Sequence, residues 1–191
     1  NVNNFESYPS AGSNAGNTFA TIDGVSISGA TTAGIMVNDN PLNTNGAKVF
    51  AEIKNLTVSG TATGILINGA DANANIHNNT IIANAVGINV TGTSTSSTAG
   101  LTIASNTINF SSQLIATIPT TAILLNKVTG TAAATISSNT IAGSYYGYMV
   151  YNLNTLPKTT IAGGTITGVM QGVAAINIDP AGSGVRAPST L

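Results

Sequence analysis

Three side chains that can hold or exchange a proton recur at one position of a repeated motif. Asp23, Lys54 and His77 each follow an Ile directly. If the motif stacks, a carboxylate, an ammonium and an imidazole become neighbours, and such a set could move a proton. The simpler interpretation is an exposed ion pair with a histidine beside it, worth about 0–1 kcal/mol. The sequence favours the simpler interpretation because this position continues as Ala104 and Ser137.

The composition restricts other chemistry. The chain has 191 residues, no Cys and one His, which excludes a thiolate or multi-histidine metal centre. Five Lys and Arg residues against six Asp and Glu residues provide no basic surface for nucleic acid or an anionic membrane. No apolar run approaches the length of a membrane-spanning helix. We therefore predict no metal, no cofactor, no nucleic-acid partner and no membrane-embedded part.

A short motif occurs six times, and it determines the predicted fold. It begins with Ile and ends with Thr or Ser followed by Ile or Val. Its copies occupy residues 22–27, 53–58, 76–81, 103–108, 136–141 and 161–166. A second apolar element, usually opened by Gly, follows at 34–37, 64–67, 87–90, 122–125, 147–150 and 172–175. The apolar positions alternate with period two, which is typical of strands, and the constant order indicates parallel stacking.

Stacking the copies in register produces chemically uniform columns. Both terminal Ile or Val positions of the motif, and the Ile of the second element, form inward columns of mostly β-branched residues. Between the first two columns lie Asn79, Asn106 and Asn139 in three successive copies. Amides carry donors and acceptors, so we predict a buried asparagine ladder in the middle copies. The Thr or Ser of the motif forms an outward hydroxyl column, which keeps the surface polar although only 6% of the residues are charged.

These Asn-Asn-Thr-Ile and Gly-Ile repeats resemble the right-handed parallel β-helix of the pectate-lyase-like superfamily, particularly in bacterial surface and periplasmic proteins. The resemblance implies an all-β solenoid of about six coils over residues 20–178. Residues 1–19 would then be an N-terminal segment that could pack on the solenoid, and residues 179–191 a tail or link. An insertion at 111–120 lengthens the fourth unit and is expected to form a loop.

Lyases and hydrolases of this fold act through clustered carboxylates, often with calcium, and through Arg or Lys. In this chain no two acids share a motif position in successive copies. The acids are Glu6, Asp23, Asp39, Glu52, Asp71 and Asp179. We therefore predict no catalytic residue.

Two surfaces are candidates for binding a partner or a sugar. Tyr145, Tyr146 and Tyr151 bring aromatic rings into one coil, where they could stack on a sugar or cover the insertion. The outward position of the second element forms a nearly apolar stripe, which solvent alone does not require. The members of this apolar stripe, with Asn89 as its polar exception, are Met36, Leu66, Leu124, Met149 and Ala174. The terminal segments and another polypeptide are equally suitable covers.

The sequence favours a non-catalytic structural or adhesive segment of a bacterial secreted or cell-surface protein, such as a stalk, adhesin or filament module. Neither end resembles a finished solenoid, so the expected partners are further segments of a longer β-helix or another polypeptide, with polysaccharide as a further option. The alternative is a carbohydrate-binding or polysaccharide-cleaving β-helix with its active groups on loops such as 39–48 or 111–120. An ice-binding protein is a lesser alternative, because a second regular Thr row is missing. The expected location is extracellular or at the cell surface, and the periplasm is a further option.

Overall fold

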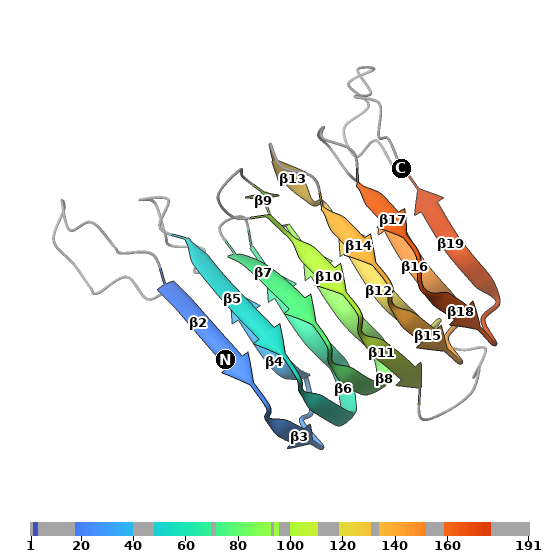
Figure 1. Cartoon of the computed structure of the whole chain (residues 1–191), viewed down its shortest axis with the longest axis horizontal. Coiled ribbons are helices and arrows are strands. Elements are labelled where there is room, and N and C mark those ends of the chain that lie inside the picture. The colour runs from blue at the N-terminus through green and yellow to red at the C-terminus, as the bar shows by residue number, and fades with distance from the viewer. Residues whose placement is uncertain are drawn as a thin grey trace, which may run out of the picture.

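The computed structural model describes residues 2–3, 18–39, 48–69, 72–92, 94–95, 100–110, 119–130, 134–151 and 159–176. Within these ranges the chain forms strands and turns and contains no helix. Figure 1 shows the strands in layers, ordered along the molecule from blue near the N-terminus to red near the C-terminus. The architecture is therefore all-β, as predicted.

The first half of each motif copy contributes one strand to a parallel six-stranded sheet. Its strands, in spatial order, are β2 (Thr18–Asp23), β5 (Val49–Lys54), β7 (Ala72–His77), β10 (Thr102–Ala104), β14 (Thr135–Ser137) and β17 (Thr160–Ala162). The motif Ile residues pair in register, from Ile22 opposite Ile53 to Ile136 opposite Ile161. All six copies therefore stack. Several connections between the strands lie outside the described residues, so fewer than the six predicted turns can be followed along their whole length.

Eleven further strands form a second parallel sheet. Its strands are β1 (Val2–Asn3), β3 (Ser26–Ser28), β4 (Ala33–Asn38), β6 (Thr57–Asn68), β8 (Thr80–Thr91), β11 (Thr107–Phe110), β12 (Thr121–Asn126), β15 (Thr140–Ala142), β16 (Tyr146–Tyr151), β18 (Thr165–Thr167) and β19 (Gln171–Ile176). In the second and third units, β6 and β8 each span both elements without a break, where the other units have two strands. A small separate sheet joins β9 (Ser94–Thr95) to β13 (Thr129–Gly130).

The inward columns form one continuous core, in the register that the sequence predicted. The second column begins with Ile27 opposite Val58, and the third places Ile123 opposite Tyr148. The central members of the columns are fully buried, whereas the end members, such as Ile22 and Ile166, are partly exposed. Each coil therefore depends on its neighbours in the stack to cover its apolar side chains.

The predicted asparagine ladder is present at the corner between the two sheets. Nδ2 of Asn79 donates to Oδ1 of Asn106 at 2.9 Å, and Nδ2 of Asn106 donates to Oδ1 of Asn139 at 3.0 Å. All three side chains are buried. Each Nδ2 also donates to a carbonyl oxygen of the preceding coil, and these acceptors belong to Ile53, Ile76 and Ile103. The ladder thus links successive coils and satisfies backbone groups at a buried corner.

The residue before each ladder asparagine has a left-handed backbone. Asn78, Ser105 and Ser138 have φ of 58°, 56° and 56°. Such values are uncommon for residues with a side chain, so the surrounding contacts must hold the corner in place. The corner is not confined to the ladder, because Asn55, which precedes Leu56, has a φ of 56° at the same position.

The ladder ends where Gly164 replaces asparagine. A Cβ at Gly164 would collide with the backbone of Asn139, so this corner accepts no side chain. Tyr148 lies inside the coil that contains Asn139 and is 1% exposed. Burial raises the pKa of Tyr148, and the nearby Asn139 amide partly opposes the rise, although the phenol oxygen meets no partner at hydrogen-bond geometry.

Candidate functional site

The predicted column of Asp23, Lys54 and His77 lies on the outer face of β2, β5 and β7, paired in register. Nζ of Lys54 is 4.0 Å from Oδ2 of Asp23 and 3.4 Å from Oε1 of Glu52. Nε2 of His77 is 3.3 Å from the same Glu52 oxygen. We call these four residues the charged cluster. Glu52 was absent from the predicted set because it lies one column away; the alternation of β5 could have identified it, since Glu52 and Lys54 point to the same face.

Two asparagines orient the charged cluster. Nδ2 of Asn55 donates to Oδ1 of Asp23 at 2.7 Å. Nδ2 of Asn78 is 3.1 Å from Nδ1 of His77. Because an amide nitrogen only donates, Nδ1 of His77 accepts, and the neutral imidazole carries its proton on Nε2, where it faces Glu52. The imidazole is therefore held in one tautomer between an amide donor and a carboxylate acceptor.

These contacts predict how stability depends on pH. The hydrogen bond from His77 and then the Lys54 ammonium hold the pKa of Glu52 below its ordinary value of 4.5. A depressed carboxyl pKa stabilises the folded state above the unfolded pKa, and this contribution is lost as pH falls through the folded pKa. We therefore expect the stability advantage of the wild type over Glu52→Gln to disappear as pH falls below 4.5 and through the lowered pKa of Glu52 in the folded chain. Urea unfolding followed by circular dichroism measures this difference; a difference independent of pH would contradict these contacts.

Two phenylalanines lie beside the charged cluster on the same outer face. Phe19 of β2 is opposite Phe50 of β5, and their ring centroids are 6.4 Å apart. Phe19 is 75% exposed. The alternation of β5 places Phe50, Glu52 and Lys54 on one side of the strand. Sequence analysis missed this aromatic pair because both residues precede the repeated motif.

The tyrosines of the fifth unit separate into core and surface groups. Tyr145 and Tyr146 are partly exposed, with ring centroids 4.7 Å apart. Their backbone N–H groups donate to Oγ1 and O of Thr120, both at 2.9 Å, so they lie beside the end of the insertion. Tyr148 is buried, as its inward column indicated. Tyr151 ends β16, and its side chain lies outside the described residues. A binding role for Tyr145, Tyr146 and Tyr151 stays a prediction.

The apolar stripe follows the outer face of β4, β6, β8, β12, β16 and β19. Met36 is opposite Leu66, and Leu124 is opposite Met149. Asn89 lies between Leu66 and Leu124, and its Oδ1 is buried with no hydrogen-bond partner. All members are partly exposed. What covers the stripe stays a prediction.

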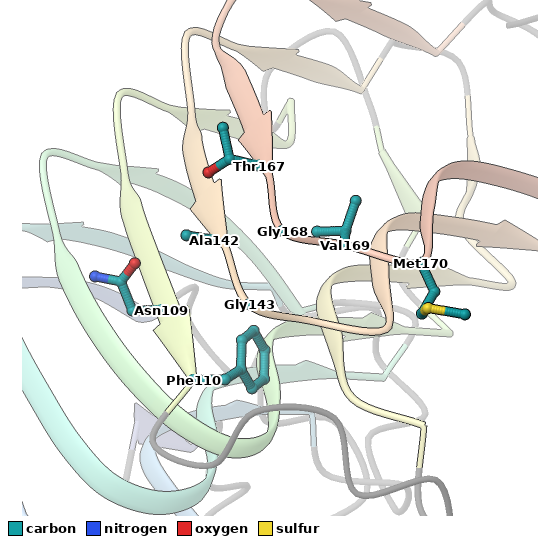
Figure 2. Close-up of a pocket in the computed structure, with 8 residues that line it drawn as sticks. All are labelled: Asn109, Phe110, Ala142, Gly143, Thr167, Gly168, Val169 and Met170. Atoms are coloured by element: carbon teal, nitrogen blue, oxygen red, sulfur yellow. The ribbon is translucent and has the colours of Figure 1, made fainter.

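A cleft of about 570 Å³ lies at the ends of β11, β15 and β18. Its lining is formed by Asn109, Phe110, Ala142, Gly143, Thr167, Gly168, Val169 and Met170. Figure 2 shows Asn109, Ala142 and Thr167 on neighbouring strands and the ring of Phe110 below Gly143. Phe110 directly precedes the insertion, of which residues 111–118 lie outside the described part. The lining residues carry no charge, so they offer packing and hydrogen bonds to a ligand and no acid or base.

The described acids do not form a metal site. No group of three His, Asp or Glu side chains within the described ranges could hold a metal ion. Among the acids, Glu6, Asp71 and Asp179 lie outside those ranges. The same ranges contain no helix that could span a membrane.

Stacked parallel strands, buried Ile columns and an asparagine ladder define a β-solenoid whose candidate sites lie on its outer faces. Residues 11–181 match the family described as the right-handed β-helix region. The chain therefore belongs to the right-handed β-helix family, which is consistent with the pectate-lyase-like superfamily. No curated protein and no solved structure matches the chain.

Proposed function

We propose that the chain is a non-catalytic structural or adhesive segment of a bacterial secreted or cell-surface protein. The observation that carries this proposal is the buried asparagine ladder within an in-register stack. Hydrogen bonds between coils oppose bending and separation at each ladder corner, which suits a stalk, adhesin or filament module. The charged cluster supports the same role, because its carboxylates are paired with Lys54 and His77 on the outer face of a sheet.

The proposed partners are further segments of a longer β-helix or another polypeptide. In the described part of the chain, β17, β18 and β19 pair with a strand on one side only. Val173, a member of the third inward column, is 51% exposed. An unpaired edge with accessible apolar groups favours the addition of another strand. Such a role agrees with an extracellular or cell-surface location, or with the periplasm.

The first test is the size and shape of the purified chain at several concentrations, measured by light scattering and small-angle X-ray scattering. We expect elongated species whose mass increases with concentration, because strand edges associate. A compact monomer at every concentration would argue against end-to-end extension. In parallel, a panel of polysaccharides is incubated with the chain, and no reducing sugar or unsaturated product is expected. Release of either product would replace the non-catalytic proposal.

A carbohydrate-active protein is the second candidate. The cleft of about 570 Å³ is the observation that favours it, since its size suits a small ligand. The polysaccharide panel distinguishes cleavage from the structural role. Ice binding is the lesser candidate, and it relies on the in-register hydroxyl column that includes Thr57 opposite Thr80 and Thr107 opposite Thr140. Thermal hysteresis of the freezing point would identify it.

A further inference from the structure

We propose that the outer face of β2, β5 and β7 binds an uncharged glycan. The site consists of the aromatic pair Phe19 and Phe50 together with Glu52, Lys54 and His77. It lies on a sheet face and shares no residue with the lining of the cleft. The proposal goes beyond the structural role and does not depend on it, because a rigid segment and an enzyme could both carry such a surface.

The aromatic pair provides the apolar half of the site. Phe19 is 75% exposed, although it lies on a strand face whose next outward residues are Thr21 and Asp23. The Phe50 ring lies 6.4 Å away and is tilted by 49°, so the two rings form a short angled platform. The C–H-rich face of a sugar ring packs on such exposed aromatic rings, which present a large apolar surface at a small cost in side-chain entropy.

The charged cluster provides the polar half at a suitable distance. Outward residues two apart on a strand are separated by about 7 Å, and neighbouring strands by about 5 Å. Glu52 therefore lies roughly one sugar ring from Phe50, and Lys54 lies another step beyond. The side chains of Glu52, Lys54 and His77 are 35%, 26% and 24% exposed, so each retains accessible surface.

The mixture of donors and acceptors identifies the ligand chemistry. Glu52 accepts hydrogen bonds and Lys54 donates them, and a sugar hydroxyl can do both. Asn75, opposite Glu52 on β7, adds an amide with both functions. Hydroxyl groups that lie side by side on a sugar ring can therefore bond neighbouring members of the cluster.

The ion pairs indicate that the ligand is uncharged. The carboxylates of Asp23 and Glu52 would repel an anionic ligand, and the ammonium of Lys54 would repel a cationic ligand. Lys54 already lies within 4.0 Å of both carboxylates, so a charged ligand would compete with these existing pairs. A neutral hydroxyl adds a hydrogen bond without removing them.

The test is affinity gel electrophoresis of the full chain in mixed-linkage β-glucan, xyloglucan and galactomannan, with polygalacturonate as the acidic comparison. We expect at least one neutral polysaccharide to retard the wild type and polygalacturonate not to do so. Phe19→Ala should weaken binding roughly tenfold and Phe19→Tyr should retain it, since the aromatic face supplies the contact. Glu52→Gln should weaken binding severalfold, because the acceptor loses its charge.

The matched control is Thr135→Ala, an exposed position on β14 of the same sheet, which should bind as the wild type does. Circular dichroism verifies that each variant is folded, and Phe19 is exposed enough for its truncation to leave the core intact. The proposal is overturned if no neutral polysaccharide retards the wild type, if only polygalacturonate does, or if folded Phe19→Ala binds unchanged. None of these results affects the scattering and product-release tests of the structural role.

Discussion

Replacing Asn106 with Ala is expected to lower the free energy of unfolding by about 4 kcal/mol. Asn106 is the central ladder residue and is 1% exposed. Its Oδ1 accepts from N and Nδ2 of Asn79 at 3.1 and 2.9 Å. Its Nδ2 donates to O of Ile76 at 3.1 Å and to Oδ1 of Asn139 at 3.0 Å. Truncation removes all four hydrogen bonds. Their partner groups stay buried, where water does not replace the lost bonds.

Urea unfolding followed by circular dichroism measures this effect. The matched control is Asn68→Ala, which removes an exposed asparagine whose Nδ2 donates to Oδ1 of Asn38 at 2.7 Å. We expect this control to change stability by less than about 1 kcal/mol, because water satisfies the groups that it leaves. If Asn106→Ala were as mild as Asn68→Ala, the ladder would not hold the coils together.

Gly87→Ala is expected to destabilise the chain by about 2–3 kcal/mol. Gly87 opens the Gly-Ile element of the third unit and is buried. A Cβ at this position would lie 2.5 Å from Cγ2 of Ile108 and 2.6 Å from the carbonyl oxygen of Ala122. Because the carbonyl belongs to a paired strand, the neighbouring coil must shift to relieve the overlap. The cost therefore reflects close packing between coils.

Gly172→Ala is the matched control, because Gly172 has the same motif position in the last unit and a Cβ there would meet no atom within 4 Å. We expect this substitution to leave the urea midpoint unchanged or slightly raised, since alanine restricts the unfolded chain. Equal destabilisation by the two substitutions would contradict the packing explanation. Together, the two pairs of variants separate the contribution of stacking from that of the individual strand.

The inward residues could be predicted from the sequence because a stacked repeat imposes the same environment on every copy. The Ile columns and the asparagine ladder therefore follow from residue type and order, and the observed register agrees with them. Tyr148 occupies the Ile position of the second element in the fifth unit, and for the same reason it was correctly predicted to be in the core. Repetition also indicated the parallel direction of the strands, since the same elements return in the same order.

The outward contacts could not be predicted to the same extent. Position in the repeat placed Asp23, Lys54 and His77 together, but Glu52 joins them from the adjacent column through side chains that reach across the sheet. The length and rotamers of these side chains decide such contacts, and repeat spacing contains no information about either. Phe19 and Phe50 were missed because the strands extend toward the N-terminus beyond the repeated motif.

By itself, the sequence determined a parallel solenoid with a ladder, because burial selects apolar and amide residues at fixed positions of each copy. Only the tertiary structure decided that β6 and β8 are continuous and that the corner at Gly164 has no room for a Cβ. It also decided that an aromatic pair and a charged cluster share one outer face. The physical reason is that the core must repeat from coil to coil, whereas the surface is free to differ, and the residues that distinguish this protein lie on the surface.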